Sequence, residues 1–290
     1  MSEFLSILIL TRNEEIHISR CLESAFRLTK LVYVLDSNSI DKTPEIAVNL
    51  GAILISGEFN SFSDKLNWGL ENIEFKTPWV MRLDADEVLS EGLIAQVPEL
   101  LRTLDLDVVG IYVKRQLWFM GRWMRFGGMY PTYSMRLWRP DAVFCESRDL
   151  DEQIILRRGR HVILQVDIMD IPLTDLTSWI NKHNNYATLE AHSVLRAQQS
   201  NANEGYFMSL FGTLPQRVRW IKTHIFYRLP LFVRPALYFI YRYFLRFGFL
   251  DGRVGFIFHF MHGFWYRFLI DAKINEARLK FTKKIPDSSG

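Results

Sequence analysis

The chain has 290 residues, of which 49% are hydrophobic and 23% charged, and its formal net charge is +3. These values exclude a disordered or collagen-like chain and allow one large or two modest domains of roughly 100–200 residues each. The two cysteines, Cys21 and Cys145, are too few for a disulfide framework or a four-thiolate zinc site. No basic flank precedes the short apolar run at the N-terminus, so we expect no secretory signal and a cytoplasmic protein.

In the first hundred residues, strand patterns alternate with helix patterns. Apolar runs predict strands over 7–10, 31–35, 52–55 and 79–83, with helices after Asn13, from Thr43-Pro44 and over 64–73. This alternation predicts an α/β domain with a parallel sheet, and such sheets bind ligands beyond the carboxyl ends of their strands. Polar residues gather at these ends: Thr11, Asn13, Asp36, Ser37 and Asp84.

The second half of the chain has a different pattern. Strands are predicted over 108–116, 135–139 and 161–166, with glycine and proline between them, and a helix over 177–197. The last ninety residues show helical segments broken by proline and glycine. We therefore expect an α/β domain over residues 1–200 and a helical module over residues 201–290.

Charge and aromatic residues are concentrated in that helical module. Between residues 217 and 286 the chain has 14 Lys and Arg against three acidic residues, whereas residues 1–216 have 21 basic and 28 acidic residues. The longest stretch without Lys, Arg, Asp or Glu is 254–266, thirteen residues, and a membrane-spanning helix needs about twenty.

Arginines among large aromatics are typical of helices in the headgroup layer of an anionic membrane. A buried core or an oligomer interface is the main alternative, but three acids cannot pair fourteen bases. Nucleic acid is disfavoured by the acidic first part of the chain and the high apolar content.

Asp84-Ala-Asp86 is the sharpest chemical motif. Two carboxylates just past a strand suit Mg²⁺ or Mn²⁺, which prefer oxygen ligands and bridge protein carboxylates to substrate phosphates. Taken alone, the motif also fits a solvated turn, and Asp36–Thr43 also fits an ordinary capped turn into a helix.

Four segments in this order carry a resemblance: Ser6–Glu15, Asp36–Thr43, Phe62–Leu70 and Trp79–Glu87. Together they resemble the family-2 glycosyltransferases of the GT-A (Rossmann-like) fold, an inverting family that uses nucleotide-sugar donors. Ser6–Glu15 resembles the first strand and T-x-N-E-E loop, and Asp36–Thr43 resembles the D-S-G-S-T-D-G-T loop. Phe62–Leu70 and Trp79–Glu87 resemble the path into the D-x-D motif. Asn38 replaces a usual glycine, which asparagine can do because it tolerates left-handed backbone; Ile40 and Lys42 depart further.

The resemblance implies a donor site. Asp36 would accept a hydrogen bond from the nucleobase or ribose, and three residues would line the same pocket: Thr11, Asn13 and Glu14. Asp84 would contact the donor and, with Asp86, hold Mg²⁺ or Mn²⁺ against the leaving diphosphate. Lys65 would reach the nucleotide or a phosphate, and a solvated helix face is the alternative.

Inverting transfer also needs a base for the acceptor hydroxyl. The resemblance implies that Glu152 or Asp151 is this base, with Glu152 preferred, and that Asp149 is a solvated or capping residue. Neighbouring carboxylates raise one another's pKa, which suits a base. Gln153 stands where some relatives have histidine.

Two further segments fit the same family. Met129–Arg139 resembles the strand before the catalytic acid, with Arg136 or Arg139 as a phosphate partner. Trp179–Ala187 resembles a helix of bacterial members that build surface polysaccharides, where Lys182 and His183 contact diphosphate or acceptor; a structural role is the alternative for His183.

Taken together, the resemblance implies a bacterial enzyme that moves a sugar from a UDP-, GDP- or dTDP-linked donor to a lipid-linked saccharide. The product would be a lipopolysaccharide, capsule or similar glycan, made by a peripheral protein at the cytoplasmic face of the inner membrane. Oligomerisation stays open, and no nucleic-acid partner is expected. The alternatives are a non-catalytic, membrane-recruited scaffold that binds nucleotide sugar, and a sugar nucleotidyltransferase, whose usual glycine-rich phosphate loop is missing from Thr11–Glu15.

Overall fold

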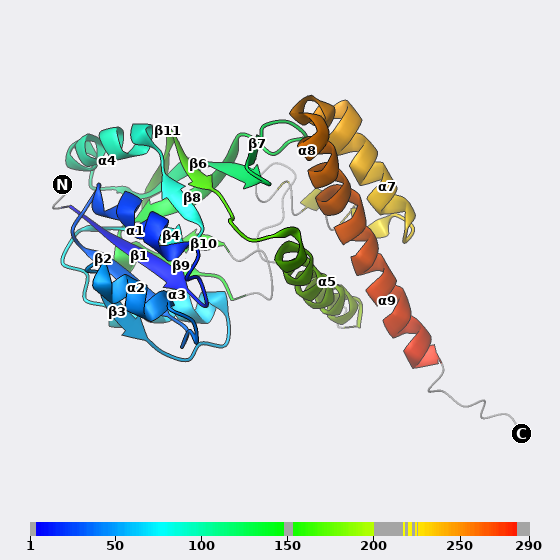
Figure 1. Ribbon diagram of the computed structural model, residues 1–290, viewed down its shortest axis with the longest axis horizontal. Coiled ribbons are helices and arrows are strands. Elements are labelled where there is room, and N and C mark those ends of the chain that lie inside the picture. The colour runs from blue at the N-terminus through cyan, green and yellow to red at the C-terminus, as the bar shows by residue number, and fades with distance from the viewer. Residues whose placement is uncertain are drawn as a thin grey trace, which may run out of the picture. The chain divides into compact units, whose positions relative to one another are not determined.

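The computed structural model describes residues 4–147, 153–199, 217, 220–221, 224 and 226–282. The chain forms two compact units (Figure 1): Met1–Arg125 with Met129–Asp175, and Phe126–Gly128 with Leu176–Gly290. The first helix of the second unit is α5 (Leu176–Gln199). The units therefore divide at Asp175, whereas the sequence predicted a boundary at residue 200.

The first unit is built on one large sheet, whose strand order is β3-β2-β1-β4-β8-β6-β11-β5. Its first four strands pair in parallel and match the four strands predicted in the first hundred residues. They are β1 (Leu5–Thr11), β2 (Val32–Asp36), β3 (Ile53–Ser56) and β4 (Trp79–Asp84). Thr11, Asp36 and Asp84 each occupy the carboxyl end of a strand, as the sequence predicted.

The parallel sheet predicted from the first hundred residues is confirmed, and the rest of the sheet, for which no strand direction was predicted, is mixed. The strands are β5 (Glu87–Leu89), β6 (Val108–Phe119), β7 (Arg122–Met124), β8 (Thr132–Trp138) and β11 (Arg160–Asp170). β8 lies antiparallel between β4 and β6, because the chain returns from β6 to β8 without a crossover helix. β9 (Val143–Cys145) and β10 (Ile154–Leu156) form a separate antiparallel pair.

Helices cover the sheet on both faces, and the side chains of β1 pack against helices on each face. Ile7 and Ile9 pack into a core with α1 (Ile18–Phe26), α2 (Thr43–Asn49) and α4 (Glu91–Thr103). Leu8 and Leu10 point the other way, into a core with α3 (Phe62–Asn72) and β9. Alternate side chains of a strand face opposite sides of its sheet, so β1 is buried throughout and its carboxyl end is held rigidly.

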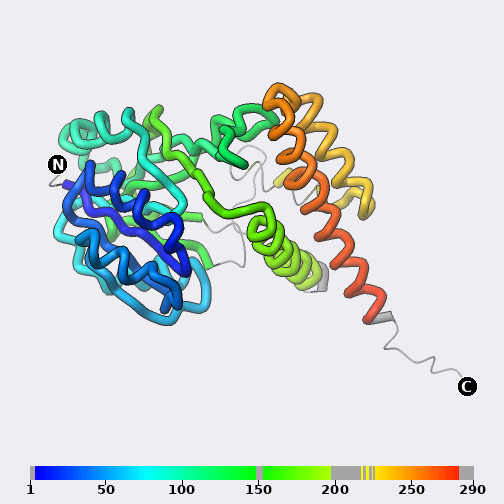
Figure 2. Tube along the Cα trace, in the orientation of Figure 1, coloured from blue at the N-terminus to red at the C-terminus, as the bar shows by residue number. Residues whose placement is uncertain are grey.

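The second unit is helical, as predicted. After α5 and a short helix η2 (Phe226–Arg228) come α7 (Val233–Ile240), η3 (Tyr241–Leu245), η4 (Gly248–Asp251), α8 (Gly252–Phe258), η5 (His259–Trp265) and α9 (Tyr266–Thr282). α5 and α9 pack through a small apolar core, and Figure 2 traces both helices. No helix in the described residues is long and apolar enough to cross a membrane.

Several arginines of this unit are interior, which the sequence did not predict. Arg234 Nε donates to Asp271 Oδ1 at 2.7 Å, and Arg267 Nη1 lies 2.9 Å from Glu190 Oε1. Arg242 Nε donates to the Gly127 carbonyl at 3.1 Å. Pairing was possible because Glu190 on α5 and a backbone carbonyl supply acceptors that the count of acids between 217 and 286 left out.

Candidate active site

The carboxyl ends of β1 and β2 bring Thr11 and Asp36 together. Thr11 Oγ1 donates to Asp36 Oδ1 at 2.8 Å, as their opposite positions in the two strands require. Ser39 adds two donors to the same carboxylate, its backbone N–H at 2.7 Å and its hydroxyl at 2.6 Å. Asp36 is fully buried, and these three hydrogen bonds fix the direction of its carboxylate.

The loops after β1 and β2 are tied to each other. Asn13 N–H donates to Ser39 Oγ at 2.7 Å, and Asn13 Oδ1 accepts from the Ile40 N–H at 2.9 Å. Asn13 and Asn38 have left-handed backbone, with φ of 56° and 48°. Asparagine is one of the few residues that adopts this conformation readily, so the replacement of glycine by Asn38 works as the sequence predicted. These hydrogen bonds hold the two loops in a fixed position relative to each other.

Lys65 on α3 belongs to the same site. Its Nζ donates to the Thr11 carbonyl at 2.6 Å, and only 6% of the residue is exposed. Burial lowers the pKa of Lys65 to about 8, against an opposing effect of the Asp36 carboxylate. The alternative of a solvated helix face is therefore wrong, and a buried cation lies beside the Asp36 carboxylate.

Glu14 is held by His17, a residue that sequence reasoning missed. His17 Nδ1 lies 2.6 Å from Glu14 Oε2, and His17 Nε2 accepts from the Leu173 N–H at 2.9 Å. Because Nε2 accepts, the proton of a neutral ring is at Nδ1 and is donated to Glu14. The one available signal was the spacing of three residues between Glu14 and His17 at the start of a helix.

Asp84, whose side chain is 36% exposed, borders a buried network of charges. Asp84 Oδ2 accepts from Arg136 Nη2 at 3.1 Å and from Arg82 Nη2 at 3.3 Å, and Arg136 Nη2 also donates to Glu87. Burial raises the pKa of Asp84, but Arg82 and Arg136 outweigh it and hold that pKa well below its ordinary value. Burial raises the pKa of Glu87 to about 7, although Arg136 opposes the rise.

Arg115, on β6, connects this network to β11 and to the edge strand β5. Its Nε donates to Asp170 Oδ2 at 3.0 Å and lies 3.9 Å from Glu87 Oε1. Glu87 and Asp170 are opposite one another on β5 and β11. Each carboxylate therefore has a guanidinium beside it, as buried charges require. The network joins strands that are far apart in sequence. It holds Arg136, on β8, within hydrogen-bond distance of Asp84, on β4.

Asp86 follows in the turn between β4 and β5. It is half-buried, and its carbonyl accepts from the Ile171 N–H at 3.0 Å. Within the described residues, no three His, Cys, Asp or Glu side chains are grouped so as to hold a metal ion. Mg²⁺ commonly takes one or two carboxylates together with substrate phosphates. The carboxylates of Asp84 and Asp86 therefore suit a cation that also binds a phosphate of the ligand. They do not suit a cation that protein side chains alone enclose.

Three predicted acidic residues cannot be placed. Glu152, Asp151 and Asp149 lie outside the described residues, in the segment between β9 and β10. The assignment of the base to Glu152 or Asp151 stays a prediction.

Lys182 and His183 lie on α5, in the second unit. The ring of His183 stacks on Trp179 with 3.5 Å between centroids, and its Nδ1 is 2.9 Å from the Trp179 carbonyl. Burial lowers the pKa of His183 to about 4. These contacts favour the structural alternative for His183, whereas the side chain of Lys182 is exposed.

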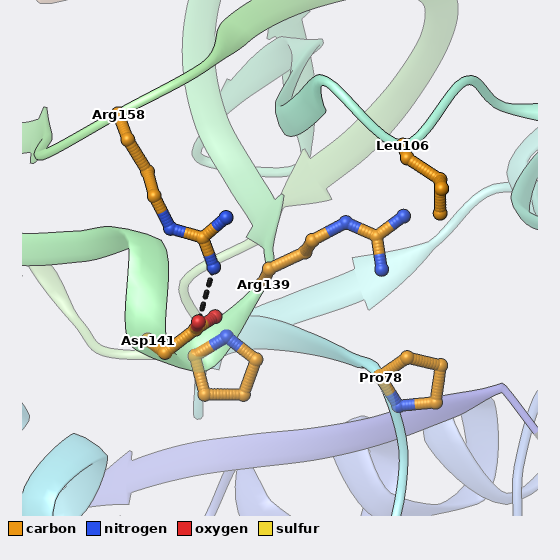
Figure 3. Close-up of a pocket in the computed structure, with 6 residues that line it drawn as sticks. Pro78, Leu106, Arg139, Asp141 and Arg158 are labelled. Carbon is orange, nitrogen blue, oxygen red and sulfur yellow. Dashed lines mark hydrogen bonds and ion pairs between the residues drawn. The ribbon is translucent and has the colours of Figure 1, made fainter.

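A cavity of about 490 Å³ lies at the opposite end of β4 from Asp84 (Figure 3). Its lining is Pro78, Leu106, Arg139, Pro140, Asp141 and Arg158, with an ion pair between Arg158 and Asp141. The Arg139 guanidinium lies over the Trp79 ring at 4.8 Å, and its Nε donates to the Val108 carbonyl. Arg139 is therefore remote from Asp84, and of the two predicted phosphate partners only Arg136 lies near it.

Comparison with known proteins agrees with the motifs. Residues 6–149 match the model of Glycosyl transferase family 2. The lipopolysaccharide core biosynthesis glycosyltransferase LpsC of Rhizobium meliloti is 27% identical over 298 residues, covering 98% of this chain and 97% of that protein. An uncharacterized glycosyltransferase of Rickettsia bellii is 33% identical over 111 residues, 37% of each protein.

Among solved structures, glucosyl-3-phosphoglycerate synthase from Mycobacterium tuberculosis in complex with Mn²⁺ and UDP-glucose is similar with a TM-score of 0.46. The identity is 15%, over 73% of this chain and 84% of that one. The match to the family model begins in β1 and takes in Thr11, Asp36, Lys65 and Asp84. The family resemblance predicted from four short segments is confirmed.

Proposed function

We propose that this chain, a glycosyltransferase with a family 2 domain over residues 6–149, transfers a sugar with inversion from a nucleotide sugar to a saccharide acceptor. The observation that carries the proposal is the hydrogen-bonded group Thr11, Asp36 and Lys65 at the carboxyl ends of β1 and β2. A fixed carboxylate suits the N–H and O–H donors of a nucleobase or ribose, and a buried ammonium suits a phosphate.

Asp86, beside Asp84, would hold a divalent cation, Mg²⁺ or Mn²⁺, which supplies charge neutralisation for the departing diphosphate. The chain itself keeps Asp84 ionised and correctly directed, through Arg82 and Arg136. Glu152 or Asp151 would take the proton from the acceptor hydroxyl. The roles of Asn13 and Glu14 in lining the donor pocket are part of the same proposal.

Similarity to LpsC over almost the whole of both proteins supports a lipid-linked saccharide of the lipopolysaccharide core type as acceptor. Such an acceptor is reached at the cytoplasmic face of the inner membrane. We therefore propose a peripheral protein there, whose second unit contacts the anionic membrane surface.

A panel of UDP-, GDP- and dTDP-sugars tests the proposal, by the melting temperature of the purified protein and by release of nucleoside diphosphate, with Mn²⁺ and with a chelator. We expect one nucleotide to stabilise the protein and its sugar to be released, both dependent on metal. Stabilisation without release, even with acceptor-containing membrane extract, would support the scaffold alternative. Absence of both responses would contradict the donor site.

Lys65 makes donor affinity depend on pH. Because the pKa of Lys65 is about 8, the ammonium that would face the donor is lost as the pH rises through that value. We expect the Kd for the preferred nucleotide to rise from about pH 8 upward, by up to about tenfold per pH unit. Calorimetric titration from about pH 7 to about pH 9 measures it. Lys65→Met should bind weakly and without this step.

The contribution of Lys65 to the free energy of unfolding changes with pH in the opposite direction to donor affinity. The pKa of Lys65 is lower in the folded chain than the ordinary 10.5, so the unfolded chain binds more protons between about pH 8 and 10.5. This group therefore makes the free energy of unfolding rise with pH in that range, while donor affinity falls.

A pH-independent Kd in the unmodified protein would contradict contact between Lys65 and the donor.

A further inference from the structure

The second unit carries many exposed apolar side chains over residues 237–260, which we call the aromatic surface. Each is at least 39% exposed: Leu237, Ile240, Tyr241, Phe244, Leu245, Phe247, Phe249, Leu250, Phe256 and Phe260. They come from α7, η3, η4, α8 and η5 and from the turn between η3 and η4. Single exposed apolar residues are ordinary, but a contiguous patch on a folded protein marks a place where something binds.

Ring contacts join the five exposed phenylalanines of this surface into one group. Phe239 and Tyr243 stack with 5.3 Å between centroids and act as its centre. The contacts that connect the exposed rings to them are Phe239–Phe244, Phe239–Phe260, Tyr243–Phe249, Tyr243–Phe256 and Phe247–Phe249. Rings from five helical elements, α7, η3, η4, α8 and η5, and from the turn between η3 and η4 are thus connected.

The exposed charges around the aromatic surface are positive. Over the described residues 226–270 the exposed charged side chains are Arg228, Arg246 and Arg253. The acidic residue of this stretch, Asp251, is buried and accepts from the Phe126 N–H at 3.0 Å. An apolar patch with arginines and without exposed carboxylates complements a surface that is apolar and anionic.

Phe247, in the turn between η3 and η4, gives a second and independent indication. Its φ is +59°, a left-handed conformation that is strained for a bulky side chain and easy for asparagine or glycine. The side chain is nevertheless 57% exposed. The folded chain would be less strained with asparagine here, so the phenyl ring serves contact with something outside the chain.

We infer that the aromatic surface, with Phe247 in its exposed turn, inserts into the boundary between headgroups and acyl chains of an anionic bilayer, without crossing it. The inference names the residues that make the proposed membrane contact. It rests on the proposed function, because the contact would give the enzyme access to a lipid-linked acceptor. A bilayer accommodates apolar rings at this depth and arginines in its headgroup layer.

Sedimentation of the full chain with vesicles tests this inference. We expect binding to vesicles of phosphatidylcholine with phosphatidylglycerol, and much weaker binding to phosphatidylcholine alone. Phe247→Asn together with Phe244→Ser should lower the partition coefficient at least about tenfold. Leu106→Ser, which removes an exposed apolar side chain of the first unit, is the matched control and should bind like the unmodified protein.

Phe247→Asn alone separates membrane binding from folding. Because asparagine relieves the left-handed strain, its melting temperature should equal or exceed that of the unmodified protein while its vesicle binding falls. Equal vesicle binding by the unmodified protein and the double variant would overturn the inference. So would a protein that is dimeric without lipid and becomes monomeric on Phe247→Asn, because the patch would then join two copies.

The outcomes also separate this inference from the proposed function. Loss of vesicle binding with unchanged release of nucleoside diphosphate is expected for the Phe247→Asn and Phe244→Ser double variant. An unmodified protein that releases nucleoside diphosphate but never binds vesicles overturns the inference and the membrane contact proposed with it, and leaves the donor site and sugar transfer standing. A protein that binds anionic vesicles but has no response to any nucleotide sugar contradicts the proposed function and leaves the membrane surface standing.

Discussion

Asp86→Asn is expected to lower sugar transfer about 10²–10³-fold while leaving the fold intact. Asparagine has the shape of aspartate but no charge, so it weakens the proposed hold on a divalent cation at the place where diphosphate charge develops. The Asp86 carbonyl, which accepts from the Ile171 N–H, is unchanged by the substitution. Single-turnover transfer at saturating donor, over a range of Mn²⁺ concentrations, measures the loss.

The matched control for this variant is Asp141→Asn. Asp141 is an exposed carboxylate paired with Arg158 at the opposite end of β4, so its loss should leave transfer unchanged. Wild-type turnover and the same Mn²⁺ dependence in Asp86→Asn would contradict the assignment of the cation to this residue.

Arg136→Met is expected to destabilise the protein by about 3–5 kcal/mol, because it leaves carboxylates in the interior without their cation. Arg136 is 2% exposed and donates to both Asp84 and Glu87. Methionine fills a similar volume, so the loss reflects charge more than a cavity. Urea unfolding followed by circular dichroism gives the free energy of unfolding.

The cost of Arg136→Met should increase with pH. The pKa of Glu87 in the folded chain is already about 7, above the ordinary 4.5, so its ionisation makes folding less favourable as the pH rises from about 4.5 to about 7. Removing Arg136 raises that pKa further and extends this loss to higher pH. The variant should therefore be closest to the unmodified protein near pH 5 and furthest from it above about pH 8.

Two further variants separate charge from packing. Adding Glu87→Gln to Arg136→Met removes one of the unpaired charges and should recover part of the lost stability. Arg158→Met breaks an exposed ion pair and should change the free energy of unfolding by no more than about 1 kcal/mol. An Arg136→Met protein as stable as the Arg158→Met control at every pH would contradict the buried network.

The strands of the first hundred residues and the loops after β1 and β2 could be predicted because their signals are local. Apolar runs, an asparagine in left-handed backbone and polar residues at strand ends are all visible within a few residues. The later strands were predicted as strands but without their directions, because one strand's pattern does not reveal its partner's direction. Arg136 reaches Asp84 only because β8 is inserted antiparallel beside β4, a pairing of residues far apart in sequence.

The interior arginines were missed for a related reason. Counting acids between residues 217 and 286 left out Glu190 on α5, which binds Arg267 and accepts from the hydroxyls of Tyr227 and Tyr266. The predicted boundary at residue 200 separated α5 from the helices it packs against. Arg246, Arg253 and many aromatics of residues 237–260 are exposed, and the predicted contact with a membrane surface stays a prediction.

Transfer of labelled sugar to a lipid-linked saccharide tests the central claim most directly. The preferred nucleotide sugar, labelled in its sugar, is incubated with the protein, Mn²⁺ and membranes that contain a truncated lipopolysaccharide core. We predict label in the lipid fraction, an anomeric configuration opposite to that of the donor, and loss of both with chelator or with Asp86→Asn. A protein that binds the nucleotide sugar yet leaves all label in the donor, with every acceptor preparation, would contradict the account.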